Sequence, residues 1–355
     1  MKNTTFLFFS FLLLTCLSCK HSTEPVTKVK DLRALSWTID TLNGNNIDQL
    51  VLYDIWGTSA SDVYAAGHAS GGRCVFHYNG KSWSNVNYHI IDGGQIKGSV
   101  SLRKIFGFNS KNVFIIGSKS DYNPNPPPTF IDSSFIMNYD GVSWREMVTP
   151  GGRILTALWG ASTNDIWVGG SGPTLFHYDG INWRNATIGA NIDHINDIVG
   201  ISPQAVYALC YKKDVGIEDT SYHSIYKWNG ENWLIVDSFT LVYNQIDYKF
   251  GTAKLLFLDG KLYSCGVGIY RYTGSVWERI HYREGEKFFI DIGGTSGDNF
   301  LAVGGGGQAY HFNGRDWFRY EHLQSMGDFW AVWTDGIEVF IAGTDGWRSY
   351  VIHGK

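Results

Sequence analysis

The chain has 355 residues, 44% of them hydrophobic and 17% charged, and a formal net charge of −4. Because 33 Asp and Glu offset 29 Lys and Arg and no basic stripe is present, the composition argues against nucleic acid as a partner. Three of the five cysteines, Cys74, Cys210 and Cys265, lie beyond the first 20 residues, too few for a disulfide framework. We expect buried thiols, with a Cys210–Cys265 disulfide as the alternative.

Residues 1–19 have the pattern of an export signal. A Lys precedes a short apolar run (Phe6–Leu14), which is shorter than the roughly 20 residues that a helix needs to cross a bilayer. The following Leu17-Ser18-Cys19 resembles the lipobox of bacterial lipoproteins. This resemblance implies that Cys19 carries a lipid that binds the membrane, and that the protein is exported to the outer membrane or cell surface. A cleaved signal without a lipid is the alternative.

Residues 20–33 are polar and show no hydrophobic periodicity, so we expect a flexible tether. Residues 34–355 carry a repeat instead: an aromatic residue, then Asn, Asp or Thr, then Gly, two variable residues and Trp. Its six copies read "YNGKSW", "YDGVSW", "YDGINW", "WNGENW", "YTGSVW" and "FNGRDW". Asn-Gly and Asp-Gly between apolar runs are strong signals of a two-residue hairpin turn.

The spacing of the repeat predicts the architecture. Seven Trp residues mark it, at steps of 39 to 61 residues, and propeller blades repeat at roughly 40–50 residues. These are Trp37, Trp83, Trp144, Trp183, Trp233, Trp277 and Trp317. Within one repeat, for example residues 54–86, four β-rich runs are separated by turns. The sequence therefore predicts an all-β fold, a seven-bladed β-propeller with four antiparallel strands per blade.

The ends of the chain are expected to complete one blade together. The last repeat, which ends in "YVIHGK" (350–355), has three strands and no closing Trp, whereas "LSW" (35–37) is a Trp with no turn before it. A closed ring removes the exposed edges of the sheets. We therefore expect the strand at Ser36–Ile39 to pair with Arg348–His353, so that the N-terminal strand completes the last blade.

Two repeat families are similar to this pattern. The segment "IWVGGSGPTLFHYDGINW" (166–183), in which a strand ends in Gly-Gly before a Tyr and a Trp, is similar to the kelch repeat. The segment "WGTSASDVYAAG" (56–67) resembles the Trp-Gly-Ser-Ser/Asp-Val repeats of exported bacterial propeller proteins. The resemblance covers residues 34–355 and implies the fold and interaction through a surface, but no particular reaction.

The regular residues of the repeat are expected to have structural roles. A Trp placed after every turn favours packing between blades over carbohydrate stacking. Asp62, Asp165 and Asp298 stand at turns, where Asp side chains bond to the local backbone.

Irregular segments all fall on one side of the predicted ring. In an up-and-down blade, the turns between strands one and two and between strands three and four lie on one face. The longer segments, 118–134 and 210–223 within blades and 84–103, 234–251 and 278–289 between blades, belong to the other face. Loops on a rigid scaffold are where binding residues gather. The ligand-binding residues that we expect there are Tyr88, Tyr122, Tyr211, Lys212, Tyr222, His223, Tyr248 and Tyr282.

A second candidate site lies at the mouth of the central channel. Asp54, Lys104 and Asp197 each stand one residue before the apolar pair of an innermost strand. Charged residues at this position either form a ligand site or line a wet channel as paired, solvated groups.

Binding is favoured over catalysis. Catalysis on this scaffold would need carboxylates about 5–10 Å apart or a metal cluster, and no local motif has metal-ligand spacing. We expect a monomeric, lipid-anchored module of the cell envelope that binds glycan or protein through its loop-rich face, with no cofactor and no metal. The alternative is a carbohydrate-active enzyme, either a hydrolase, a lyase or an oxidase. A third class is a structural partner in an envelope complex, which an apolar patch among the loops would favour.

Overall fold

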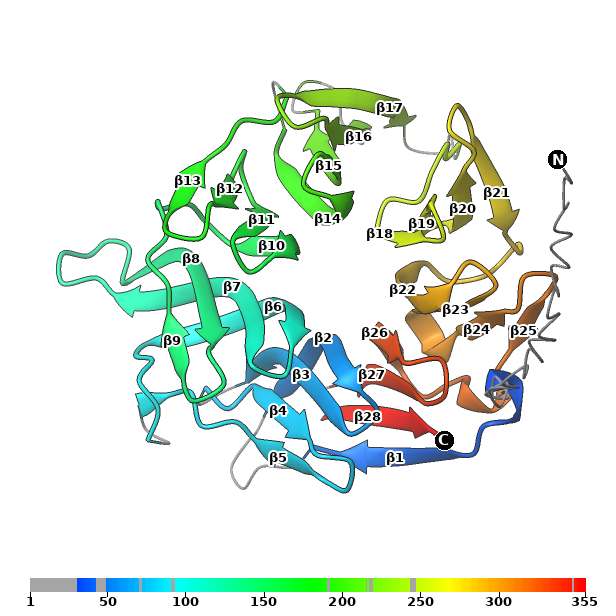
Figure 1. Ribbon diagram of the computed structural model, residues 1–355, viewed down its shortest axis with the longest axis horizontal. Helices are drawn as coiled ribbons and strands as arrows, with labels where there is room; N and C mark the ends of the chain where they lie inside the picture. The colour runs from blue at the N-terminus through cyan, green and yellow to red at the C-terminus, as the bar shows by residue number, and fades with distance from the viewer. Residues whose placement is uncertain are drawn as a thin grey trace, which may run out of the picture.

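Seven four-stranded sheets stand around a central axis in the computed structural model (Figure 1). The structure describes residues 31–42, 49–69, 72–90, 93–189, 192–214, 216, 220–242, 247–346 and 348–355. We number the sheets as blades I to VII, beginning with the blade that contains β2. The expected seven-bladed β-propeller is confirmed. The export signal, Cys19 and most of the expected tether lie outside the described residues.

Blades I to VI each consist of four strands that are consecutive in the chain and antiparallel, with the first strand at the axis. Blade I holds β2 (Leu50–Ser59), β3 (Asp62–Ala69), β4 (Val75–Tyr78) and β5 (Trp83–Asn85). Blade II holds β6 (Ser99–Asn109), β7 (Asn112–Tyr122), β8 (Phe130–Tyr139) and β9 (Trp144–Glu146). Blade III holds β10 (Leu155–Ser162), β11 (Asp165–Gly170), β12 (Leu175–Tyr178) and β13 (Trp183–Asn185).

The second half of the ring repeats this order. Blade IV holds β14 (His194–Ser202), β15 (Ala205–Lys213), β16 (Thr220–Trp228) and β17 (Trp233–Val242). Blade V holds β18 (Lys254–Leu258), β19 (Lys261–Gly266), β20 (Gly268–Tyr272) and β21 (Trp277–His281). Blade VI holds β22 (Phe289–Ser296), β23 (Asn299–Gly304), β24 (Ala309–Phe312) and β25 (Trp317–Arg319).

Blade VII joins the two ends of the chain, as the sequence predicts. It holds β26 (Asp328–Thr334), β27 (Val339–Asp345), β28 (Arg348–Gly354) and, outermost, β1 (Trp37–Thr41). The strands β1 and β28 are antiparallel, with Trp37 opposite Gly354 and Thr41 opposite Tyr350. Two backbone hydrogen bonds of 2.9 Å between Ser36 and Lys355 extend the ladder. The ring is therefore closed by β1.

The segment before β1 also packs against the ring. A short 3₁₀-helix, η1 (Leu32–Ala34), places Leu32 in the core beside blade VI, and the hydroxyl of Tyr320 donates to the Leu32 carbonyl at 2.8 Å. Leu32 belongs to the stretch that the sequence suggests as a tether, yet it is buried. Two further 3₁₀ turns, η3 (Gly305–Gly307) and η4 (Glu321–Leu323), lie in connections of blade VI.

The repeat Trp residues pack between blades, as expected. Trp144 of blade II meets Tyr64 of blade I edge to face, with ring centroids 6.1 Å apart. Trp233 of blade IV meets Trp167 of blade III in the same way at 5.2 Å. Large aromatic rings such as these bury apolar area between neighbouring blades.

The two faces of the ring differ, as the order of strands requires. Turns between strands three and four have four residues in blades I to VI, and those between strands one and two have two residues in the same blades. We call this the turn face and the opposite side the loop face. Several of the long segments are strand rather than loop: β7 and β8 run out to Tyr122 and Phe130, and β17 reaches Val242.

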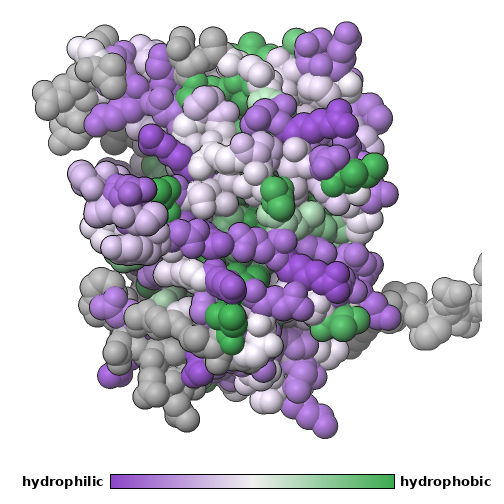
Figure 2. All heavy atoms as spheres, turned by 90° about the vertical axis from the view of Figure 1, so that its left-hand side faces the viewer, coloured by the Kyte–Doolittle hydropathy of each residue, from purple (hydrophilic) through white to green (hydrophobic). Residues whose placement is uncertain are grey.

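The outer wall shows no continuous apolar patch over the side that Figure 2 presents, where separate apolar side chains stand among polar ones. Cys74, Cys210 and Cys265 are buried free thiols, so the alternative of a Cys210–Cys265 disulfide is wrong. Within the described part of the chain, no helix is long and apolar enough to span a membrane.

Candidate functional site

A repeated β-bulge shapes the mouth of the central channel. The pairing of the first two strands skips one residue in six blades, for example between Leu52 and Asp54 and between Leu102 and Lys104. A bulge re-aims side chains, so two consecutive residues of each inner strand can face the axis. The skipped residues all line one axial cavity of about 340 Å³, and they are Tyr53, Arg103, Thr156, Asn196, Ile290 and Trp330.

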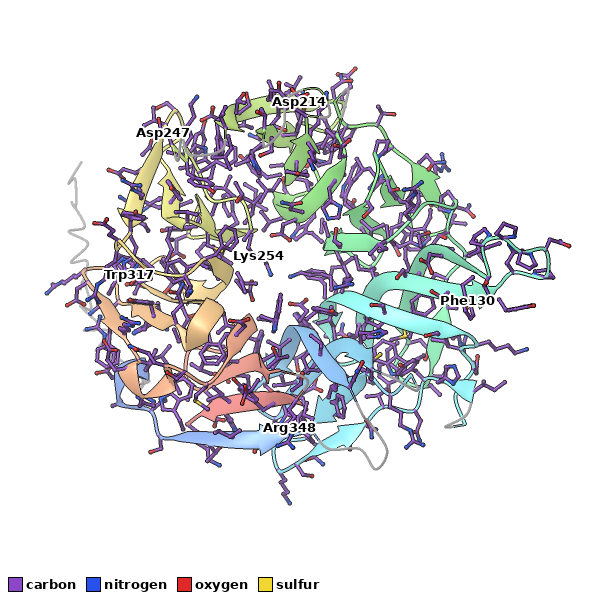
Figure 3. The ribbon with its side chains drawn as sticks, turned by 180° about the vertical axis from the view of Figure 1, so that it is seen from behind. Phe130, Asp214, Asp247, Lys254, Trp317 and Arg348 are labelled. Atoms are coloured by element: carbon purple, nitrogen blue, oxygen red, sulfur yellow. The ribbon has the colours of Figure 1, made fainter. Side chains whose placement is uncertain are left out.

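The residues that follow the bulge form a deeper ring of charges. In six blades they are Asp54, Lys104, Ala157, Asp197, Asp291 and Ala331, and Lys254 holds the equivalent position in blade V, which has no bulge. The five charged members line the same cavity, and Figure 3 shows Lys254 at the inner edge of the ring, facing the central opening. The structure thus brings Asp54, Lys104 and Asp197 together, as the sequence suggests.

Each Asp of this ring links its blade to the next. Asp54 Oδ2 accepts the backbone N–H of Ile105 at 2.8 Å, and Asp197 Oδ2 accepts that of Leu255 at 2.9 Å. Asp291 Oδ2 accepts the N–H of Val332 at 2.8 Å. A buried N–H without a partner costs about 1–3 kcal/mol, so these carboxylates hold neighbouring inner strands together.

The ammonium groups of the ring are paired with these carboxylates. Lys104 Nζ lies 3.4 Å from Asp54, and Lys254 Nζ lies 2.7 Å from Asp291 Oδ1. Burial alone would lower the pKa of Lys254, but Asp291, Asp197 and Asp54 together raise it well above its usual value. Burial raises the pKa of Asp197, and Lys254 opposes that shift. The deep ring is therefore largely compensated within itself.

The residues skipped by the bulge lie above the charged ring, where a ligand would meet them first. The Arg103 guanidinium lies 4.1 Å from the centre of the Tyr53 ring, and Tyr53 meets Trp330 edge to face at 5.9 Å. Asn196 Nδ2 donates to the Thr252 carbonyl at 2.9 Å. His194 bonds to Thr156 at 3.1 Å, and burial lowers its pKa. The aromatic corner formed by Tyr53 and Trp330, with the cation of Arg103 beside it, therefore lies above the ring of paired charges.

A second hollow of about 570 Å³ adjoins this corner. Tyr53 and Trp330 line both cavities, and Asp328 and Asp345 line the second. Trp330 Nε1 donates to Thr344 Oγ1 at 2.9 Å, which fixes the indole between the two hollows. Asp328 Oδ1 accepts the N–H of Gly306 at 2.8 Å. We call the two hollows and their shared aromatic pair the axial site.

Two residues expected in an exposed binding surface are buried instead. Tyr88 is 1% exposed, and its hydroxyl bonds to the Gly72 carbonyl and, at 3.1 Å, to Cys74 Sγ. His223 is 6% exposed and stacks on Phe239 with centroids 5.1 Å apart. Burial lowers the pKa of His223 to about 4. The expectation of exposure is wrong for both, because Tyr88 packs in the core with Ile96 of its own connecting segment, and His223 lies against Tyr211 and Phe239 of the neighbouring strands.

The remaining predicted residues lie in three separate places on the rim. Tyr211, Lys212, Tyr222 and Tyr248 gather on blade IV: Lys212 Nζ lies 5.8 Å from the Tyr222 ring, and Tyr222 donates to Asp214 at 2.8 Å. Tyr122 is 67% exposed and stands beside Phe130 on blade II. Tyr282 is 49% exposed beside Arg279 on blade V. None of these residues lines the axial site, and their role in binding stays a prediction.

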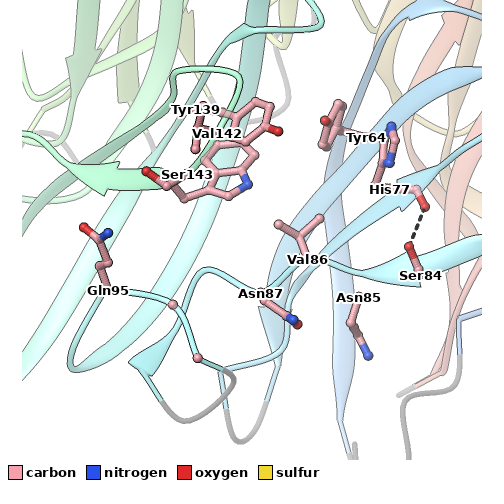
Figure 4. Close-up of a pocket in the computed structure, with 13 residues that line it drawn as sticks. Tyr64, His77, Ser84, Asn85, Val86, Asn87, Gln95, Tyr139, Val142 and Ser143 are labelled. Atoms are coloured by element: carbon pink, nitrogen blue, oxygen red, sulfur yellow. Dashed lines mark hydrogen bonds between the residues drawn. The ribbon is translucent and has the colours of Figure 1, made fainter.

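A further pocket of about 370 Å³ opens between blades I and II (Figure 4). Aromatic rings of Tyr64, Tyr139 and Trp144 form one part of its lining, and the amides of Asn87 and Gln95 form another. The amides come from the segment between β5 and β6, which the sequence identifies only as a long connection. This pocket was not predicted.

One regular feature of the blades also differs from expectation. Asp62 and Asp165 do not bond only to local groups: each accepts a 2.7 Å hydrogen bond from a His of the third strand, His77 and His177. Each imidazole also stacks on an aromatic ring of the second strand, as His77 does on Tyr64 at 4.3 Å. Asp298, by contrast, accepts from Ser296 in its own turn at 2.6 Å.

Sequence reasoning missed Tyr53, Arg103, Lys254, Asp291 and Trp330. Aligning the seven inner strands at the apolar pair would have found Lys254 and Asp291, because they occupy the same position as Asp54 and Lys104. Among the residues that the structure describes, no group of three His, Cys, Asp or Glu side chains is placed to hold a metal ion.

Comparison with known proteins identifies the fold alone. No protein-family model matches the chain, and no curated protein matches it. A structure of YCF48 bound to D1 peptide is 14% identical, with a TM-score of 0.58, covering 89% of this chain and 99% of that one. YCF48 from Cyanidioschyzon merolae is 13% identical, with a TM-score of 0.56 over 90% and 98%.

A third similar structure is the extracellular domain of the putative one-component system BT4673 from B. thetaiotaomicron. It is 12% identical, with a TM-score of 0.58, and the match covers 88% of this chain and 39% of that one.

Proposed function

We propose that this protein is a non-catalytic binding module that receives a segment of another protein at its axial site. The observation that carries the proposal is the pair of hollows that meet at Tyr53 and Trp330, with Arg103 on one side and Asp328 and Asp345 on the other. A peptide offers apolar side chains for an aromatic corner and backbone groups of both polarities for flanking charges.

Binding is favoured over catalysis by the state of the carboxylates. Asp54, Asp197 and Asp291 each hold a backbone N–H of the next blade, and Lys104 and Lys254 form ion pairs with Asp54 and Asp291. A general acid or nucleophile must instead be free to reach a substrate. The ring therefore supports the channel, and the groups above it are left to meet a ligand.

A peptide is favoured over a glycan at this site because Tyr53 and Trp330 stand nearly perpendicular, at 83°, and so offer no flat platform for a sugar ring. The similar YCF48 structure contains a bound peptide, which agrees with this choice. The pocket between blades I and II favours glycan binding as a second function, since it combines aromatic rings with Asn87 and Gln95.

The cellular setting belongs to the same proposal. Lipid attachment at Cys19 would anchor the ring to the cell envelope, outside the cytoplasm, where it could meet exported partners. Replacing Cys19 with Ala should abolish incorporation of a labelled fatty acid and release the protein from the membrane fraction. A Cys19→Ala protein that keeps its label would contradict the anchor.

The axial site is tested with a displayed peptide library and a glycan array, applied to the chain from residue 31. Peptides that bind should lose about tenfold in affinity or more with Trp330→Ala and with Arg103→Ala, because truncating a central aromatic or Arg anchor typically costs over 1.4 kcal/mol. Ile181→Ala, which changes an exposed residue of the turn face, is the control. Peptides that bind all three variants alike would refute the site.

A further inference from the structure

A large groove lies on the turn face, between blades IV and V, where the sequence gives no long segment. Its volume is about 880 Å³, within the range of roughly 300–1,000 Å³ that small-molecule sites occupy. Blades IV and V are the neighbours β14–β17 and β18–β21 of Figure 1. The groove is separate from the axial site, because turns between strands one and two and between strands three and four border it.

The repeat changes at the boundary that carries this groove. In blades I and III a Trp of the inner strand covers a glycine of the next blade: a Cβ added to Gly107 would lie 2.5 Å from Trp56, and one added to Gly200 would lie 2.6 Å from Trp159. In blade IV the Trp position holds Val199. A smaller side chain leaves space that the neighbouring blade must fill or leave open.

Blade V places a large side chain opposite Val199, and both residues pack in one core cluster beside the groove. Phe257 stands where the next blade usually has its glycine, and its ring lies parallel to Tyr207 with centroids 6.2 Å apart. The first hairpin of blade V also lacks the bulge that six other blades have. Exposed apolar side chains continue the wall outwards, since Ile201, Leu234 and Ile235 are 53%, 54% and 58% exposed.

The charge of the groove also departs from the repeat. Blades I, III and VII place a His on the third strand and bond it to an acid at or directly before the start of the second strand, as in His353 with Glu338 at 2.6 Å. Blade IV has Lys227 and Ala205 at these positions, and blade V has Arg271 and Lys261. Blades IV and V therefore lack the acid of this pair, and each has a cation in place of the His.

These cations are only partly compensated. Arg271 bonds to Glu278 at 2.7 Å, whereas Lys227 covers the Tyr207 ring at 5.5 Å and has no ion pair to a described residue. Lys261 has no ion pair within the described part of the chain either. Asp237, an acid on the neighbouring strand β17, is engaged by Lys249 at 3.5 Å. The groove is therefore apolar inside and positive at its rim.

We propose that this groove binds a small anionic amphiphile, a molecule with an apolar body and one carboxylate, sulfonate or phosphate group. The body lies between Phe257 and the wall of Leu234 and Ile235, and the acidic group meets Lys227. Apolar area that leaves water contributes about 25 cal/mol per Å², and a charge-assisted hydrogen bond to the ammonium fixes the orientation.

The test uses decanoate, well below its micelle-forming concentration, titrated into the chain by calorimetry. Decyltrimethylammonium and decan-1-ol, which have the same alkyl chain with a cationic or a neutral head, are the comparison probes. We expect decanoate to bind at least tenfold more tightly than either of them. Equal binding of all three, or no binding of decanoate, would overturn the proposal.

Two variants locate the bound probe. Lys227→Gln should weaken decanoate binding about tenfold, and Ile235→Asp, which places a carboxylate in the exposed apolar wall of the groove, should abolish binding. Lys111→Gln, an exposed Lys on the turn face of blade II, should change nothing. If Lys227→Gln binds decanoate like the unchanged chain, the groove is not the site. An acidic peptide that binds where decanoate does not would also refute a small-molecule site. None of these variants touches the axial site.

Discussion

Removing the segment that closes the ring should destabilise the whole propeller. A chain that starts at residue 43 loses β1 and its pairing with β28, and with them the buried Leu32, Leu35 and Leu42. Burial of a Leu side chain is worth about 2 kcal/mol, so these three account for about 6 kcal/mol of a typical total of 5–15 kcal/mol. The edge of β28 would also become free to pair with another molecule.

Point variants separate packing from pairing within this segment. Leu32→Ala should lower the free energy of unfolding by about 3 kcal/mol, as large-to-small changes in a core do. Ile39→Ala, on β1 but 56% exposed, should change it by less than about 0.5 kcal/mol. Urea titration followed by Trp fluorescence measures both, and size-exclusion chromatography detects association through the open edge. A chain from residue 43 that unfolds at the same urea concentration and stays monomeric would refute closure by β1.

Two further predictions concern the axis and the acid range. Asp197→Ala should lower the free energy of unfolding by about 3 kcal/mol, because it leaves the Leu255 N–H unsatisfied and removes a counter-charge of Lys254. Urea titration measures this change beside the exposed Asp140→Ala. If the two variants are equally stable, the charged ring does not link the blades. Burial lowers the pKa of His223 and of His311 from 6.5 to about 4. Between these pH values the two side chains are protonated in the unfolded chain but neutral in the folded chain. The free energy of unfolding should therefore fall as the pH is lowered from 6.5 to 4, by up to about 1.4 kcal/mol per pH unit for each His. His311→Gln should reduce this slope. An unchanged slope would show that the buried His311 is not its cause.

The architecture could be predicted because its signals are local and repeated. An Asn-Gly or Asp-Gly turn positions the two strands beside it without help from the rest of the chain, as at Asn79-Gly80, where Gly80 has a φ of 87°. Seven Trp residues then report the number of blades. The closing strand followed from the same repeat, since the fragment at Trp37 and the fragment at His353 complete each other.

The axial site could not be predicted in full because it depends on a bulge. Side chains alternate along a regular strand, so Tyr53 and Asp54 should point to opposite sides, and sequence reasoning selected only the charged one. The bulge between Leu52 and Asp54 lets both line the cavity. Arg103 and Trp330 were missed for the same reason.

The exposed rim was misjudged where a segment folds back on the body. Tyr88 lies in a connection that the sequence shows only as long and polar. In the structure, the N–H groups of Gln95 and Ile96 both bond to the Tyr88 carbonyl, and the Tyr88 ring is buried beneath this fold. The length of a connection is visible in a sequence, but which of its aromatic residues turn inward is decided by contacts between distant residues.

The two faces of the ring differ from the repeat in different ways. The loop face departs by insertion, which any count of residues between turns reveals. The turn face departs by substitution, and only the equivalent positions of the other blades show it. Val199, Ala205, Lys227 and Phe257 each replace the residue type found in blade I or III, and they come from separate strands. Of these, Lys227 and Phe257 line the groove, and Val199 packs beside it in the same core cluster as Phe257, so the changes at this boundary affect both its apolar lining and its charge. An anionic amphiphile, as proposed above, would use both features, and the decanoate titration tests whether they act together.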